Sequence, residues 1–257
     1  MAAPALALAG SSGSPSGSGG ASMGSGGTST GSSPTPNPVG QPGNITVSAT
    51  GDGITLQTNA SAFLRSGVSV TGSVPAGDAG DAVEIDELPA APGSTWTAAA
   101  VVQSQSGGSF AAKLHTGGAG PVTLRALLQG SQASSATSSP PSVSVTVYRR
   151  SLATLYGPGF WGHQTACGVI LRRHTIGVAN RTLPCGTEVQ IYYEGSVLTV
   201  PVIDRGPYAH GANWDLTMAT ARALGMPGTG TIGAAPLPTT TTTAGGATSA
   251  VARRSAR

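Results

Sequence analysis

The stretch Pro201-Val-Ile-Asp-Arg-Gly-Pro-Tyr208 belongs to the most informative part of this 257-residue chain, residues 156–224. An apolar run from Val200 to Ile203 ends at an isolated acid, Asp204, and a Gly-Pro turn follows after one arginine. Apolar residues bounded by Gly and Pro are typical of a short buried strand that ends in a loop. The pattern therefore predicts a carboxylate at a strand end, partly shielded by apolar neighbours.

Four further motifs lie close to this stretch, within residues 156–224, together with most of the aromatic residues and both cysteines. In chain order they are Tyr156-Gly-Pro-Gly-Phe-Trp-Gly162, Thr165-Ala-Cys-Gly168, Thr182-Leu-Pro-Cys-Gly-Thr187 and Trp214-Asp-Leu-Thr217. Any chemistry of this chain is expected here.

The same region has the pattern of a small β-rich domain over residues 151–237. Two strands are predicted over 189–193 and 197–203, with a hairpin turn at Glu194-Gly195-Ser196 between them. After Trp214 a short helix is predicted, because apolar residues follow at helical spacing and Gly225 supplies a left-handed stop. Strands with one late helix fit a closed barrel.

The motifs, in this order, resemble the double-psi β-barrel domain of the rare lipoprotein A family, bacterial cell-wall proteins related more distantly to expansins and barwin. The resemblance covers about a third of the chain and implies a six-stranded double-psi barrel. It also implies that the partner is a peptidoglycan glycan strand. Lytic transglycosylases of this kind cleave between N-acetylmuramic acid and N-acetylglucosamine and form a 1,6-anhydro ring, and Asp204 matches the acid of their Asp-x-Gly motif.

Four acids in this domain are candidates for proton transfer. Glu188 and Glu194 are interpreted as solvated surface, and Asp215 as a helix N-terminal residue that binds backbone N–H groups, with catalysis as its other reading. Asp204 has two readings: a shielded acid that donates a proton to the glycosidic oxygen, or a loop carboxylate that only binds backbone amides. The hypothesis is that Asp204 is the general acid/base, with help from Asp215.

The chain departs from the family at three positions. Transglycosylases of the family have Glu, Asp and His where this chain has Val169, Arg172 and Asn180. The alternative function is therefore a non-catalytic, expansin-like barrel that binds or loosens wall polysaccharide. A third reading is a protease inhibitor or interaction domain that uses only the fold.

A substrate-binding surface is predicted from aromatic and basic side chains: Tyr156, Trp161, Arg205, Tyr208 and Trp214. Flat rings bury the apolar faces of sugars, and arginine, here also Arg172 and Arg173, suits the carboxylates of peptidoglycan. The other interpretation is that some rings belong to the barrel core, Phe160 foremost and Trp214 next.

Cys167 and Cys185 are eighteen positions apart, which predicts a disulfide and does not fit a zinc ribbon. A nucleophilic thiol with His163 or His174 as base is the alternative. Because the cysteines fall inside two of the family motifs, a disulfide would tie these loops together under the groove. No metal or cofactor is predicted.

The rest of the chain is predicted in four parts. Residues 1–9 are interpreted as the remnant of a signal peptide, 10–43 as a disordered, uncharged Gly/Ser/Thr/Pro linker and 238–257 as a disordered tail. Short β-type runs over 44–149 suggest an immunoglobulin-like β-sandwich with Trp96 and Phe110 in its core. The acids Asp78, Asp81, Asp86 and Glu87 are expected in or beside turns.

The charge and the apolar content of the chain exclude two classes of partner. The net charge of +3 depends on three arginines in the last five positions, so no nucleic-acid surface is predicted. No run of 18 apolar residues exists, so no membrane span is expected, and no pattern indicates an oligomeric state. The location predicted is secreted, at the cell wall.

Overall fold

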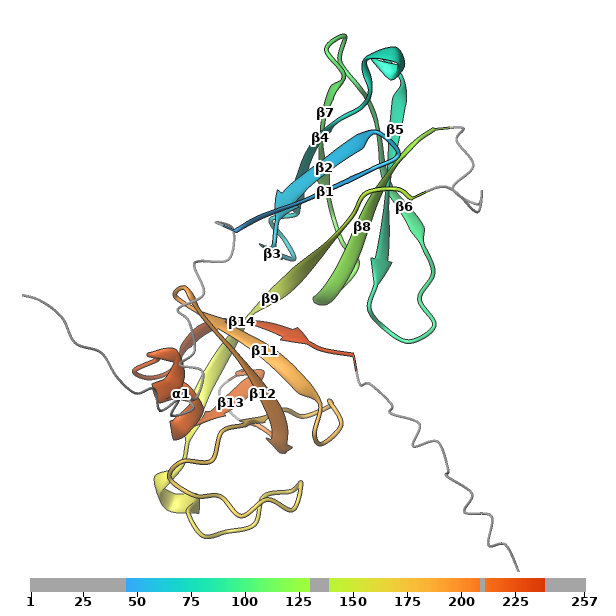
Figure 1. Ribbon diagram of the computed structural model, residues 1–257. Helices are drawn as coiled ribbons and strands as arrows, with labels where there is room; N and C mark the ends of the chain where they lie inside the picture. The colour runs from blue at the N-terminus through green and yellow to red at the C-terminus, as the bar shows by residue number, and fades with distance from the viewer. Residues whose placement is uncertain (1–44, 130–138, 209–210, 239–257) are drawn as a thin grey trace, which may run out of the picture. The chain divides into compact units, whose positions relative to one another are not determined.

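The computed structural model describes residues 45–129, 139–208 and 211–238. The predicted signal remnant, the linker and all but the first residue of the predicted tail lie outside these residues. The described chain is mainly β, as predicted (Figure 1). None of its helices is long and apolar enough to cross a membrane.

The N-terminal part of the described chain forms two groups of strands around one core. The first group, in the order β1-β2-β4-β7, is antiparallel; the second has the order β9-β8-β5-β6, with β3 parallel to β9. Alternate side chains of both groups enter the same apolar cluster. The bounds are β1 Thr46–Gly51, β2 Ile54–Asn59, β3 Ser61–Phe63, β4 Val68–Ser73, β5 Ala82–Pro89, β6 Thr97–Gln103, β7 Ser109–Leu114, β8 Gly120–Leu128 and β9 Ser142–Tyr156, with a 3-10 turn, η1, at Ala76–Asp78. The immunoglobulin-like topology stays a prediction.

Two details of this part differ from expectation. Phe110 is buried in the core, as expected, but Trp96 is only half-buried. The guanidinium of Arg125 lies 4.2 Å from the centre of the Trp96 ring. Asp86 and Glu87 lie within β5 instead of a turn, and Asp86 forms a 2.8 Å ion pair with Arg125. The bulge in the pairing of β5 with β6, between Ile85 and Asp86, lets both consecutive residues be buried.

The second half of β9 begins a closed barrel of six strands, as predicted. Strand pairing runs β9-β14-β11-β12-β10-β13 and returns to β9, so no strand of the ring has a free edge (Figure 1). Two of the pairings, β10 with β12 and β13 with β9, are parallel. The bounds are β10 Val178–Ala179, β11 Glu188–Tyr193, β12 Ser196–Asp204, β13 Trp214–Thr217 and β14 Gly230–Pro236, with a 3-10 turn, η2, at Pro158–Phe160.

Local signals explain the connections of the barrel. β11 and β12 form the predicted hairpin, whose turn residues Glu194 and Gly195 both have positive φ. The helix α1, Met218–Leu224, ends at Gly225 in the left-handed conformation, as predicted. Its N-cap is Thr217, whose side chain accepts a bond from the Thr220 N–H. The prediction that Asp215 binds the N-terminal amides of this helix is therefore wrong, because Asp215 lies within β13, two residues before the cap.

Candidate functional site

Strand register brings the two candidate acids into one row. Asp204 on β12 pairs with Ala179 on β10, Ala179 pairs with Asp215 on β13, and Asp215 pairs with Thr154 on β9. Neighbouring strands are about 4.8 Å apart, so the two acids are separated by about 10 Å across the sheet. The closed, partly parallel pairing of the barrel, rather than proximity in sequence, creates this arrangement.

Asp204 is held by the loop that surrounds it. Its Oδ1 accepts hydrogen bonds from the backbone N–H groups of Ala166, at 2.9 Å, and Arg205, at 2.8 Å. Oδ2 makes no hydrogen bond to any of the described residues. The amide-binding role considered for Asp204 is thus present in the structure, and one oxygen remains for other contacts.

Asp215 is the carboxyl whose surroundings favour the protonated form. It is half-buried, and its Oδ1 accepts a 2.9 Å hydrogen bond from the hydroxyl of Thr154. Burial raises the pKa of Asp215; the bond from Thr154 opposes this rise, and the negative charge of Asp204 adds to it. A carboxyl with a raised pKa is the kind that donates a proton near neutral pH.

Tyr156 lies at the end of β9, close enough to Asp204 and Asp215 to feel their charges. Its ring is buried in a small cluster with Leu171 and Ile203, and its hydroxyl makes no hydrogen bond to any of the described residues. Burial, followed by the charges of Asp204 and Asp215, raises the pKa of this phenol well above its usual range. Tyr156 therefore stays neutral, and its buried ring offers no face to a sugar.

A groove of about 600 Å³ lies beside Asp215. Its lining includes Thr154, Arg205, Pro207, Tyr208, Asp215 and Thr229. Three of the predicted site residues, Asp215, Arg205 and Tyr208, thus meet in one groove. Sequence reasoning missed Thr154, and a threonine in a long strand gives no signal that could have found it.

The other predicted aromatic residues do not line this groove. Trp161 is half-buried, and the guanidinium of Arg173 lies 4.7 Å from its ring centre. Trp214 is only 5% exposed and belongs to the barrel core, whereas Phe160, interpreted as core, is 59% exposed. Among the rings predicted to bind sugar, Tyr208, 79% exposed, is the one open to a substrate in the groove.

The predicted disulfide between Cys167 and Cys185 is present, so the alternative of a nucleophilic thiol is wrong. It joins the loop that contains Ala166, a donor to Asp204, to the loop before β11. Arg205 contacts the same loop, because its Nη2 lies 3.2 Å from the Sγ of Cys185 and its Nη1 donates to the carbonyl of Asn180 at 3.4 Å. The covalent link and these contacts position the strand end that bears Asp204.

Two of the three positions where the chain departs from the family, Val169 and Asn180, have structural roles here. Val169 packs against the cluster around Tyr156, and Arg172 is exposed. The side-chain oxygen of Asn180 accepts three bonds, from the N–H and hydroxyl of Thr182 and from the N–H of Leu183, at 3.0 to 3.3 Å. None of the three side chains can transfer a proton. No group of three or more His, Cys, Asp or Glu side chains that could hold a metal ion occurs in the described parts of the chain.

Comparisons with known proteins agree with this architecture. Residues 149–235 match the protein family described as lytic transglycolase. The chain is similar to the "Probable endolytic peptidoglycan transglycosylase RlpA" of Aquifex aeolicus, with 43% identity over 81 residues, which are 31% of this chain and 36% of that protein. The protein of the same name from Synechocystis sp. is 40% identical over 81 residues, 31% of this chain and 25% of that protein.

The "Endolytic peptidoglycan transglycosylase RlpA" of Campylobacter jejuni is 33% identical over 82 residues, 31% of this chain and 30% of that protein. The match thus spans between 25% and 36% of the length of these relatives. Among solved structures, the Streptomyces papain inhibitor is similar at 24% identity and a TM-score of 0.29, covering 35% of this chain and 94% of that one. The family match, the relatives and the closed ring of six strands together identify the C-terminal part of this chain as an RlpA-like double-psi β-barrel.

Proposed function

We propose that this protein acts outside the cytoplasm on the glycan strands of peptidoglycan, as an endolytic transglycosylase. One observation carries the proposal: Asp215, a carboxyl whose pKa is raised by burial and by Asp204, opens into a groove with Arg205 and Tyr208. The similarity to relatives named peptidoglycan transglycosylases supplies the substrate class. The disulfide fits an oxidising location outside the cytoplasm.

In this proposal Asp215 serves as acid and then as base, in place of Asp204, because Asp215 lines the groove and Asp204 does not. The protonated carboxyl donates its proton to the oxygen between N-acetylmuramic acid and N-acetylglucosamine, and the bond from that oxygen to C1 of the muramic residue breaks. The C6 hydroxyl of the muramic residue then attacks C1, and its proton returns to the carboxylate of Asp215. No water is consumed, and the acid is regenerated.

The neighbours of Asp215 have supporting roles in this proposal. The negative charge of Asp204 adds to the rise in the pKa of Asp215 and stabilises the positive charge that develops at C1. Tyr208 packs against a sugar face, and Arg205 binds a carboxylate of the substrate. Because Arg205 is also bonded to the Asn180 carbonyl, its guanidinium enters the reaction already oriented.

The second candidate function is glycan binding without cleavage. It is favoured by the side chains at positions 169, 172 and 180, and above all by Asn180, whose oxygen is fully used by its own loop. A barrel of this kind would hold a glycan strand in the groove through Tyr208 and Arg205. It would leave the bond intact.

The experiment that decides between them uses the full chain and isolated, peptide-free glycan strands. Mass spectrometry counts 1,6-anhydro-muramyl ends, and co-sedimentation measures binding. The variants are Asp215→Asn and Asp204→Asn, with Glu188→Gln as a control that neutralises an exposed acid on β11. Cleavage that is lost in the Asp215 variant and kept in the control supports the proposal. Binding without anhydro ends in the unsubstituted protein supports the second function, and neither binding nor cleavage rejects both.

A further inference from the structure

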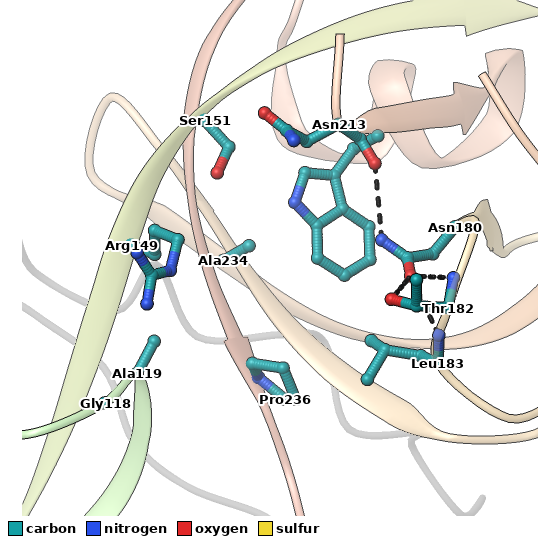
Figure 2. A pocket seen from close by; sticks show the side chains of 11 residues that line it. Gly118, Ala119, Arg149, Ser151, Asn180, Thr182, Leu183, Asn213, Ala234 and Pro236 are labelled. Carbon is teal, nitrogen blue, oxygen red and sulfur yellow. Dashed lines mark hydrogen bonds between the residues drawn. The ribbon is translucent and has the colours of Figure 1, made fainter. Parts of the chain in front are cut away.

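A second pocket, of about 430 Å³, is lined by barrel residues together with Gly118 and Ala119 of the loop before β8, and it has no part in the reaction proposed above. Figure 2 shows Arg149 on one side of it and Asn180, Thr182 and Leu183 on the other, with Ala234 and Pro236 between them. Its volume falls within the range of pockets that hold small organic ligands.

Strand β13 separates this pocket from the groove. Successive side chains of a strand point to opposite faces, and here Trp214 lines the pocket while Asp215 lines the groove. The two cavities share no lining residue. A ligand in the pocket therefore does not contact the carboxyl of Asp215.

The pocket has one charged side chain, Arg149, and no acid in its lining. The only ion pair among the described residues joins Asp86 and Arg125, so Arg149 has no acidic partner there. The lining also supplies neutral polar groups, from Thr182 and Asn213, and apolar surface, from Trp214 and Leu183. This combination suits a ligand with a single negative charge and a small apolar body.

One wall of the pocket is held in place before any ligand arrives. Asn180, 9% exposed, donates from its Nδ2 to the Asn213 carbonyl at 3.3 Å, and its oxygen fixes Thr182 and Leu183 (Figure 2). Trp214 is buried in the barrel core behind them. Binding therefore does not need to order these side chains, which keeps its entropic cost low.

We infer that this pocket binds the free carboxylate end of a short peptide whose side chains are small and apolar. Arg149 pairs with the carboxylate, the groups of Asn213 and Thr182 bond the peptide amide, and Trp214 and Leu183 pack against the side chains. The inference is independent of the transglycosylase proposal, because it uses neither acid of the groove.

The test is a titration of the ¹⁵N-labelled full chain with N-acetyl-alanyl-alanine, in its all-L and all-D forms. NMR spectra of the chain monitor the titration. The same peptides with an amidated C-terminus lack the carboxylate. The expected result is saturable binding of at least one free acid, with shifts at the amides of Thr182, Leu183 and Asn213. The affinity should fall at least about tenfold when the C-terminus is amidated.

Variants of two neighbouring arginines, Arg149 and Arg150, test which positive charge binds the peptide carboxylate. Arg149→Gln should weaken binding at least about tenfold. Arg150→Gln removes the same charge from the next residue of β9, which does not line this pocket and whose guanidinium lies 3.8 Å from the ring centre of Phe63. It should change the affinity by less than about twofold, since a charge outside the pocket is screened by salt. No binding of either acid, equal binding of the amides, equal losses in both variants, or shifts confined to the groove would each overturn the inference.

Discussion

Removal of the disulfide should destabilise the barrel strongly, and the loss in free energy of unfolding can be worked out from the length of the loop that the disulfide closes. Cys167 and Cys185 close a loop with a separation of 18 residues. In the chain-entropy model a loop of this length gives about 3 kcal/mol of stability at 25 °C, because the cross-link limits the unfolded chain. The double variant Cys167→Ser/Cys185→Ser should therefore lose about this much.

The assay is urea unfolding followed by tryptophan fluorescence. Substitution of Trp96, which lies outside the barrel, by Phe leaves Trp161 and Trp214 as barrel reporters. With a slope of roughly 1 to 3 kcal/mol per molar urea, the midpoint should fall by about 1 to 3 M. Reduction of the unsubstituted cysteines should lower it by the same amount. A loss below about 1 kcal/mol in both would refute the claim that this link limits the unfolded chain.

Four further predictions concern the site. Asp204→Asn should lower the pKa of Asp215, because the substitution removes a negative charge that raises this pKa. Thr154→Val should raise the pKa of Asp215 further, because it removes the hydrogen bond that opposes the rise. A pH titration of the Asp215 carboxyl carbon by NMR checks both, and shifts in the opposite directions would contradict the assigned causes. Because the pKa of Asp215 is raised on folding, its protonated form contributes stability that is full below the ordinary value of 3.8 and is lost as pH rises through the folded pKa. Asp215→Asn should thus gain stability relative to the unsubstituted protein as the pH rises from below 3.8, and a difference in unfolding free energy that stays constant with pH would argue against a buried acid. Tyr156→Phe removes a buried hydroxyl without a described partner and should leave stability unchanged or raise it by up to about 1 kcal/mol, whereas a loss above that in thermal unfolding would mean the hydroxyl is bonded in solution. Asn180→Ala removes three bonds that fix its loop and should cost about 1 to 3 kcal/mol, with the exposed Asn213→Ala as a control that leaves the side-chain oxygen of Asn180 bonded.

The local features of the fold could be predicted from sequence because short segments determine them. The turn at Glu194-Gly195 and the stop at Gly225 follow from residues that accept positive φ. The disulfide followed from two cysteines in a chain expected to leave the cytoplasm. The closed barrel itself came from the order of motifs, which resembles a known family, and pairing then closed the ring as that resemblance implied.

The site could be predicted only in part, because it depends on strand register between distant segments. The sequence places Asp204 and Asp215 eleven positions apart, but only the pairings through Ala179 put them in one row with Thr154. The burial of Tyr156 and Trp214 also follows from the direction in which their strands face, and composition does not reveal that direction. For the same reason Asp215, expected at a helix end, lies in a strand and opens into the groove.

The central claim, that the barrel cleaves glycan strands by transfer within the muramic residue, is tested most directly by the ends that it creates. Peptide-free glycan strands are incubated with the full chain and then treated with borohydride, which marks every reducing end, and the products are counted by mass spectrometry. The account predicts one new 1,6-anhydro-muramyl end for each break and no new reducing end. New reducing ends would show that water attacks instead, and intact strands would show that the groove binds without cleaving.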